Sequence, residues 1–380
     1  MKKNNLKYLI GNLDVSEFLK SYYGKDFLYI KRENSQYYND IFSIVDFDDL
    51  ISKNIHSAKY LKMFKVNNTI DEKNYSFFDN FNREKQISIN DVLEYFQDGF
   101  SIVLDDIARN FRNFLDIEID LAQKLSFVEN ISSNAYLTPG DSQAFPLHND
   151  IQEAFIVQLY GSKTWEIYPG SQSSNPIDFS QDHLLQDLKE KDGLKLELNQ
   201  GDLLYLPRGL AHKVYAEKNS LHVTISVVPY TYNDILKNMI STLVNSNPDF
   251  RKTIKDNSVD IKKHMIDAID SFNLNETLDV LRNKNNYNKL LNHETTIISI
   301  LDPELNEDNR FSMRENMTIN VLNGQTTFIY GAKEVEIEGD FQFLSSMESF
   351  KVSDLFNFID KDIASELLIY LSSEGFIKRI

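Results

Sequence analysis

The sequence predicts a mainly β central region that is preceded by helices and followed by a helical segment and a small α+β domain. Between residues 131 and 229, eight short segments rich in β-branched and aromatic residues are separated by turn-forming residues, which is the pattern of a β-barrel or sandwich. The segment 233–292 then shows helical spacing without strand alternation. The last 80 residues combine a hairpin signal with a helical pattern.

The first 130 residues predict mainly helices around one strand. Asp14-x-x-Glu17 has the form of a capping box, and the apolar side chains after it have helical spacing. We expect helices over residues 14–23, 41–53 and 88–115, with a break near Gly99 in the last of them, and a strand over 27–30. No reactive constellation occurs before residue 134, so we expect this part to support the central region and to wall a substrate cleft.

The central region contains the eight predicted strands and one long insertion. The strands are expected near residues 133–137, 145–150, 153–160, 163–168, 195–199, 202–206, 212–217 and 221–228. Residues 170–193, with Ser, Asn, Pro and mixed charges, form an insertion between two of these strands. Such insertions serve as lids or substrate loops, or they only decorate the surface, and both alternatives stay open.

Composition limits the classes of partner. The 380 residues include 57 acidic and 40 basic residues, which gives a formal net charge of −17. This balance argues against direct binding of nucleic acid, because phosphate contacts depend on Lys and Arg. An acidic surface suits a basic partner, or it only maintains solubility, and composition does not choose between the two.

The chain has no cysteine, so neither a disulfide framework nor a thiolate metal site is expected. Its first residues, Met-Lys-Lys-Asn-Asn-Leu, lack the apolar run of a signal peptide. No stretch approaches the roughly 18 apolar residues of a membrane span. We therefore expect a cytoplasmic protein with no membrane segment.

The residue types of a metal site occur in two stretches of the central region. His148 and Asp150 stand two apart, so both side chains point to the same side if this segment is extended. A second histidine from elsewhere would complete a 2-His-1-carboxylate face, the set that suits non-haem Fe(II) with open coordination positions. His212, after a Pro-Arg-Gly turn, is the first candidate. His222 is its rival, although a histidine in the apolar segment Leu-His-Val-Thr-Ile-Ser is more often a core residue.

Around these residues the chain resembles the Jumonji-C oxygenases, and within them the ribosomal-oxygenase-like branch with its bacterial cupin-like relatives. Five blocks in the same order carry the resemblance: Asn-Ala-Tyr-Leu-Thr-Pro at 134–139, His-Asn-Asp at 148–150, Val-Gln-Leu-Tyr-Gly-Ser-Lys-Thr-Trp at 157–165, Gly-Asp-Leu-Leu-Tyr-Leu-Pro-Arg-Gly at 201–209 with His212, and Ser-Leu-His-Val-Thr-Ile-Ser at 220–226. The resemblance implies a double-stranded β-helix (cupin or jelly-roll) fold, in a catalytic domain over residues 1–232 with its core at 131–229. It also implies a dioxygenase that uses Fe(II), 2-oxoglutarate and O2 to hydroxylate a protein or peptide side chain, giving succinate and CO2.

The same resemblance implies roles for individual residues. The implied Fe(II) ligands are His148, Asp150 and His212. The implied partners of the distal carboxylate of 2-oxoglutarate are Lys163 and Tyr136, with Asn134 and Ser226 beside them. An ammonium and a phenol suit this task because charge-assisted hydrogen bonds are about twice as strong as neutral ones. Without the resemblance, Lys163 would be interpreted as a solvent-exposed hairpin lysine.

Two further segments follow the central region. The apolar residues Ile261, Met265, Ile269 and Phe272 share one helical face, which normally means internal packing. The resemblance implies that residues 233–300 form a dimerisation segment and that residues 301–380 form a winged-helix-like domain, so we expect a homodimer. Asn323-Gly324 predicts a hairpin and residues 353–373 predict a helix. With 7 basic and 15 acidic residues in 301–380, protein contact or support fits this domain better than DNA binding.

Alternatives to a protein or peptide hydroxylase remain. The chain could instead be a non-catalytic, metal-binding cupin-like module for protein interaction, or a metal-dependent isomerase or small-molecule oxygenase. Within the hydroxylase hypothesis, a ribosomal protein and the precursor of a peptide natural product are both admissible substrates. Asn149, where relatives often have an aromatic residue, and Pro-Gly-Asp at 139–141, where Pro-Pro is common, leave the substrate open.

Overall fold

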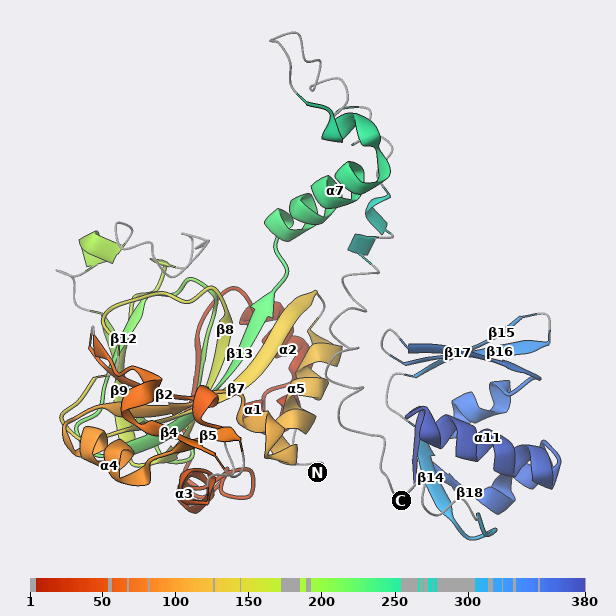
Figure 1. Cartoon of the computed structure of the whole chain (residues 1–380), viewed down its shortest axis with the longest axis horizontal. Helices are drawn as coiled ribbons and strands as arrows, with labels where there is room; N and C mark the ends of the chain where they lie inside the picture. The colour runs from red at the N-terminus through yellow and green to blue at the C-terminus, as the bar shows by residue number, and fades with distance from the viewer. Residues whose placement is uncertain are drawn as a thin grey trace. The chain divides into compact units, whose positions relative to one another are not determined.

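The computed structural model describes most of the chain and divides it into two units (Figure 1). The described residues are 5–53, 57–66, 68–80, 83–125, 127–143, 145–171, 185–188, 193–253, 305–313, 317–322, 324–330, 333–347 and 349–379, with a few residues between 266 and 278. The first unit comprises residues 1–121 and 130–229, and the second comprises residues 122–129 and 230–380. No helix in the described part of the chain is long and apolar enough to cross a membrane.

The first unit contains two main antiparallel sheets and a separate two-stranded sheet of β4 (Ser76–Asp79) and β5 (Glu84–Ile87). The larger has the strand order β1-β11-β8-β13-β7-β6-β2-β3, and the smaller has the order β10-β9-β12. The strands are β1 (Leu28–Ile30), β2 (Leu61–Lys65), β3 (Asn68–Thr69), β6 (Ser101–Leu104), β7 (Val128–Thr138), β8 (Glu153–Tyr160), β9 (Ser162–Ile167), β10 (Leu194–Asn199), β11 (Leu203–Leu206), β12 (His212–Tyr215) and β13 (Ser220–Pro229). Several hydrogen-bonded neighbours, such as β8 and β13, are far apart in sequence. The chain therefore crosses over between strands, as in a jelly roll.

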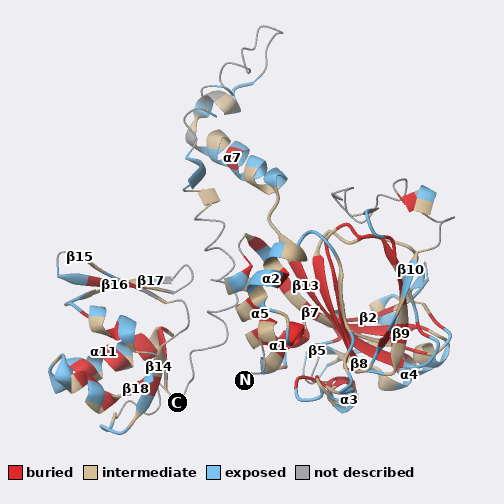
Figure 2. Cartoon of the chain, turned by 180° about the vertical axis from the view of Figure 1, so that it is seen from behind, coloured by how far each residue is buried: buried red, intermediate tan, exposed pale blue. Residues whose placement is uncertain are grey.

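Apolar side chains fill both faces of the larger sheet. Seven of the eight residues of β8, and the first eight of the ten residues of β13, are buried, as expected for strands that are covered on both sides. One core cluster joins the two sheets, with Ile156, Trp165, Leu198 and Leu206 among its members. Figure 2 shows β8 and β13 side by side, coloured as buried along most of their length.

The N-terminal part of the first unit contributes the helices, one of which packs against the larger sheet. They are α1 (Leu6–Ile10), α2 (Val15–Ser21), α3 (Ile44–Ser52), α4 (Ile89–Gln97) and α5 (Arg112–Lys124). Phe18 of α2 packs edge-on against Tyr205 of β11, with ring centroids 5.0 Å apart, and also contacts Phe155 of β8. Because side chains alternate along a strand, the neighbours of Phe155 point to the opposite face of the sheet, toward the interior.

The structure confirms most of the predicted elements and corrects two. Residues 101–104, expected inside a helix, form the buried strand β6. The helix before them ends at Gln97 with Asp98 as its C-cap, and Gly99 has a positive φ of 93°, which stops a helix and redirects the chain. Residues 145–150, expected as a strand, contain only an isolated bridge at His148. Pro146 has no N–H to donate to a ladder, which weakens a strand at this point.

The second unit contains a helix after the barrel and a small α+β domain. Helix α7 spans Tyr232–Ser246. The predicted face from Ile261 to Phe272 lies outside the described residues except for Ile269. The remaining elements are β14 (Arg310–Met313), β15 (Thr318–Leu322), β16 (Gln325–Tyr330), β17 (Lys333–Glu338), β18 (Ser349–Lys351), α11 (Lys361–Ser373) and β19 (Ile377–Arg379). They form two three-stranded sheets, β18-β14-β19 and β15-β16-β17, whose side chains share a core with those of α11. The predicted hairpin of β15 and β16 is confirmed.

The turn between β8 and β9 yields a stability prediction. Gly161 has φ 63°, and a Cβ added there would meet the backbone oxygen of Asn219 at 2.2 Å. Gly170 also has a positive φ, but nothing lies within 4 Å of its added Cβ. Gly170→Ala should therefore cost about 1 kcal/mol from backbone strain alone, and Gly161→Ala about 3 kcal/mol or more. Thermal unfolding midpoints of the two variants measure this, and equal shifts would contradict the packing assigned to this turn.

Candidate active site

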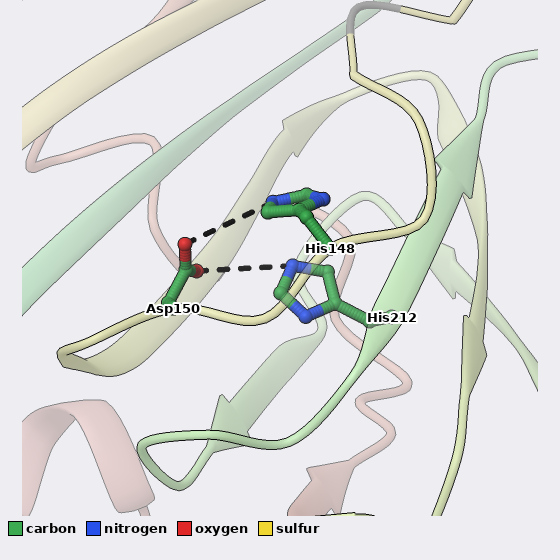
Figure 3. Close-up of side chains that lie close together, drawn as sticks. All are labelled: His148, Asp150 and His212. Carbon is green, nitrogen blue, oxygen red and sulfur yellow. Dashed lines mark ion pairs between the residues drawn. The ribbon is translucent and has the colours of Figure 1, made fainter. Parts of the chain in front are cut away.

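Three side chains with metal-ligand chemistry converge inside the first unit. Asp150 Oδ1 lies 3.8 Å from His148 Nε2, and Asp150 Oδ2 lies 3.8 Å from His212 Nε2. One ligand atom from each residue falls within 4.8 Å of the others. Figure 3 shows the two imidazoles and the carboxylate turned toward a common point. This is the only such group of three His or carboxylate residues in the part of the chain that the structure describes.

Backbone carbonyls fix the orientation of both histidines. His148 Nδ1 lies 2.8 Å from the carbonyl oxygen of Pro146, and His212 Nδ1 lies 2.9 Å from that of Leu210. A carbonyl can only accept, so each Nδ1 carries a proton and each Nε2 is the ring nitrogen that faces Asp150. Metal-binding histidines are commonly held in this way. Burial lowers the pKa of His212 to about 4, so that imidazole is neutral at physiological pH.

A short backbone pairing brings the histidines together. The N–H of His148 donates to the carbonyl of His212 at 3.0 Å, and the N–H of His212 donates back at 2.8 Å. Two further contacts hold the backbone next to the Asp150 carboxylate. The N–H of Gly209 donates to the backbone oxygen of Asp150, and the side chain of Arg208 donates to the backbone oxygen of Ile151. The Pro-Arg-Gly turn therefore positions all three side chains.

The three side chains line a cavity of about 490 Å³ between the two sheets. Its apolar wall includes Ile156, Trp165, Leu206 and Val214. Its polar wall, apart from the three converging residues, comprises Lys62, Asp105, Asn134, Tyr136, Thr138, Ser142, Gln152, Lys163, His222 and Thr224. A deep, mostly apolar hollow with a few convergent polar groups is the usual form of a small-molecule site.

Lys163 is the unusual member of this wall. It is only 4% exposed, so it is not the surface lysine that its hairpin position suggests. Its ammonium donates to Thr138 Oγ1 at 2.8 Å and contacts His222 Nδ1 at 3.0 Å. It makes no ion pair with a carboxylate among the described residues, and burial lowers its pKa to about 7. A buried cation of this kind is costly unless an anion accompanies it.

Tyr136 and Asn134 line the same cavity from β7. The ring of Tyr136 stacks on that of His222, with centroids 4.8 Å apart and planes within 3°. Burial raises the pKa of Tyr136, and Asp105 and Asp150 raise it further, so its hydroxyl stays protonated and can donate. The side-chain oxygen of Asn134 accepts from the backbone N–H of Asp106, which fixes the amide in the wall.

The structure places Ser226 outside the cavity, whereas Thr138 and His222 lie in its wall. Ser226 is not part of the cavity wall, and its buried Oγ has no hydrogen-bond partner among the described residues. The geometry therefore does not support Ser226 as a contact of a molecule in this cavity. Thr138 and His222, by contrast, hold the ammonium of Lys163. Thr138 could have been predicted from the sequence, because it lies two residues after Tyr136 and therefore shares the strand face of Asn134 and Tyr136.

Comparisons with known proteins agree with this geometry. The family model of the JmjC domain matches residues 107–235. A Dictyostelium discoideum protein named bifunctional lysine-specific demethylase and histidyl-hydroxylase NO66 is 27% identical over 239 residues, covering 61% of this chain and 45% of its own. Ribosomal oxygenase 1 of Gallus gallus is 29% identical over 227 residues, covering 58% of this chain and 36% of its own. The chain thus spans less than half the length of these relatives.

Solved structures show the same fold. A structure of the ribosomal oxygenase YcfD from Escherichia coli, in complex with cobalt and 2-oxoglutarate, superimposes with a TM-score of 0.52. The match covers 97% of this chain and 98% of that one at 12% sequence identity. A second structure of E. coli YcfD gives a TM-score of 0.54 at 13% identity. The chain thus shares the fold of these structures, residues 107–235 match the JmjC domain, and the chain is similar in sequence to NO66 and ribosomal oxygenase proteins.

Proposed function

We propose that the chain is an Fe(II)- and 2-oxoglutarate-dependent dioxygenase that hydroxylates a side chain of a protein or peptide. The observation that carries this proposal is the pairing of two features in one cavity. His148, Asp150 and His212 form a metal-binding face, and the buried cation Lys163 lines the same cavity without a carboxylate partner among the described residues. A dicarboxylic keto acid fits this combination, because one end can chelate a metal while the other meets the ammonium.

The donor set fits Fe(II). Two neutral imidazoles and one carboxylate occupy one face of a metal and leave its other positions open. Both Nε2 atoms are directed to the same side, since each Nδ1 donates to a backbone carbonyl. The chain offers no cysteine thiolate that would favour a closed structural zinc site. We assign His148, Asp150 and His212 as the ligands.

The opposite wall fits 2-oxoglutarate. We assign Lys163 and Tyr136 as the groups that bind its distal carboxylate, with Asn134 beside them. Trp165 adds a further indication that a polar ligand belongs here, because its indole N–H is buried in the cavity wall without a hydrogen-bond partner in the described structure. When bound, iron and 2-oxoglutarate supply the oxidation, in which O2 and the substrate C–H yield a hydroxyl group, succinate and CO2.

In this proposal the residues of the chain hold the metal and the cosubstrate and keep water out of the cavity. The histidines and Asp150 fix the metal, and Lys163 sets the orientation of the cosubstrate around it. Apolar side chains such as Ile156 and Leu206 exclude water from the cavity, which strengthens the polar contacts inside it. No side chain needs to act as a general acid or base, because the reactive chemistry belongs to the metal and its cosubstrate.

A basic protein segment is the substrate class that we favour. The names of the relatives refer to lysine demethylation, histidyl hydroxylation and ribosomal oxygenase, and the net charge of −17 suits a basic partner. The cavity wall also carries Asp105, in an ion pair with the half-exposed Lys62 at 2.5 Å. A ribosomal protein is the first substrate to test, and the precursor of a peptide natural product is the second.

The parts outside the barrel have supporting roles in this proposal. Residues 301–380 form a winged-helix-like domain in which β19 follows α11 and pairs with β14, and its excess of acidic residues suits protein contact. The absence of cysteine fits a cytoplasmic location. Tyr232, Leu236 and Ile240, four residues apart on α7, are 87%, 53% and 51% exposed. We assign this apolar stripe to a homodimer interface with a second copy of the chain.

Turnover tests the proposed activity. Purified protein loaded with Fe(II) should convert 2-oxoglutarate to succinate and add one oxygen atom to a protein in a ribosomal extract. His148→Ala should lose most of its iron and its turnover. Lys163→Ala should raise the KM for 2-oxoglutarate by about 10- to 100-fold, the cost of one charge-assisted hydrogen bond. The exposed Lys195 on β10 provides the control, since Lys195→Ala should behave as wild type. Absence of 2-oxoglutarate turnover by the iron-loaded wild type would refute the proposal.

Sedimentation tests the homodimer. A carboxylate in the middle of an apolar interface is costly because it loses its hydration, so Leu236→Glu should convert the dimer to a monomer at micromolar concentration. Lys237→Glu changes the charge of an exposed neighbour on the same helix and should leave the dimer intact. A wild-type monomer, or a dimer that survives Leu236→Glu, would exclude this stripe as the interface.

A further inference from the structure

His222 has an arrangement that neither the metal nor a simple core role explains. Its Nδ1 lies 3.0 Å from the ammonium nitrogen of Lys163. An ammonium can only donate, so Nδ1 accepts and the ring proton sits on Nε2. The ring is stacked on Tyr136 and meets the edge of Trp165, with centroids 5.7 Å apart. Both contacts fix its plane, and a register shift in β13 at Leu221 and His222 sets its direction.

The ammonium of Lys163 is therefore held by two neutral acceptors on two other strands. Thr138 Oγ1 on β7 and His222 Nδ1 on β13 take two of its three N–H groups. Thr138 is itself fixed by a hydrogen bond from Ser101. Neither acceptor carries a negative charge, so the lysine is placed accurately while its charge is not neutralised.

We propose that His222 is a positioning residue for the cosubstrate: a neutral acceptor that, with Thr138, holds the Lys163 ammonium in place and leaves its charge and third N–H for the distal carboxylate of 2-oxoglutarate. This inference rests on the proposed function. A carboxylate at position 222 would pair with Lys163 and occupy it. An apolar side chain there would leave the ammonium held from one side only.

Few other charged groups act on Lys163. Its ammonium contacts Thr138 on β7 and His222 on β13. Tyr136, which stacks on His222, is the titratable group that β7 adds to the same cavity wall. Its cross-strand partner on β10 is Leu198, which does not titrate. The remaining titratable groups of the cavity wall are Lys62, Asp105, His148, Asp150 and His212. Burial and the charge of Lys163 both lower the pKa of His222, so His222 remains neutral.

This arrangement makes cosubstrate binding depend on pH. Burial lowers the pKa of Lys163 to about 7, and only the charged form can pair with a carboxylate. Above that pH, binding must therefore take up a proton, and the affinity for 2-oxoglutarate should fall by up to about tenfold per pH unit. The hydrogen bond to His222 favours the charged form of the lysine. Its removal should lower the pKa of Lys163 and move the whole profile to lower pH.

The test is titration of 2-oxoglutarate into Mn(II)-loaded full-length protein from pH 6 to pH 9. His222→Leu should bind about tenfold more weakly at pH 8, and its profile should move to lower pH. His222→Asn places an amide oxygen close to the position of Nδ1 and should restore affinity to within about threefold of wild type. His222→Asp should bind at least tenfold more weakly with a flat profile, because its carboxylate keeps Lys163 charged and occupied.

The readouts separate positioning from structural damage. Mn(II) content should equal that of wild type in all three variants, since His222 is not among the metal ligands. Thr138→Val removes the other acceptor and should give the same change as His222→Leu, which provides a second test if a variant at 222 does not fold. Wild-type pH profiles in both His222→Leu and His222→Asp would overturn this inference and leave the proposed function intact. A wild type that binds Mn(II) but no 2-oxoglutarate at any pH would overturn both.

Discussion

The reciprocal pair of backbone hydrogen bonds between His148 and His212 determines the geometry of the site. These residues are far apart in sequence, and the segment that carries His148 is otherwise irregular. The pairing attaches this segment to β12 and so extends the smaller sheet at its edge. Asp150 then falls between the two imidazoles because Gly209 and Arg208 hold the backbone at 150–151. Backbone pairing to the edge of a sheet thus fixes His148 and Asp150 in place although the segment that carries them is not a strand.

The second constraint is the burial of one positive charge. The apolar surroundings that keep water from the cavity also lower the pKa of Lys163, so the protein bears the cost of that desolvation while no anion is bound. A pair with a protein carboxylate would remove the cost, but it would also consume the charge. Neutral acceptors avoid this outcome. They stabilise the ammonium enough to position it, and a bound dicarboxylate gains the remaining electrostatic energy.

Much of the site could be predicted from the sequence, because its residues occur in short ordered blocks. His148, Asp150, His212, Lys163 and Tyr136 all line one cavity. The prediction for residues 145–150 was wrong: His148 and Asp150 converge through a bridge and a turn, not through the alternation of a strand. Periodicity also misassigned β6, since four consecutive buried residues fit a helix or a strand equally well. The sequence offers His222 only as a metal ligand or a core residue, because its partner Lys163 is close in space and distant in sequence.

The central claim is that one cavity holds both a metal and 2-oxoglutarate, with Lys163 as the anchor. Anaerobic titration of the apo protein with Fe(II) and 2-oxoglutarate tests it directly, by the weak visible metal-to-ligand charge-transfer band of the chelate. We expect this band in wild type, and in Lys163→Ala we expect the same band at about 10- to 100-fold higher 2-oxoglutarate concentration. Bound iron without any band in wild type would contradict the claim, and would indicate a metal-binding module that does not take the cosubstrate.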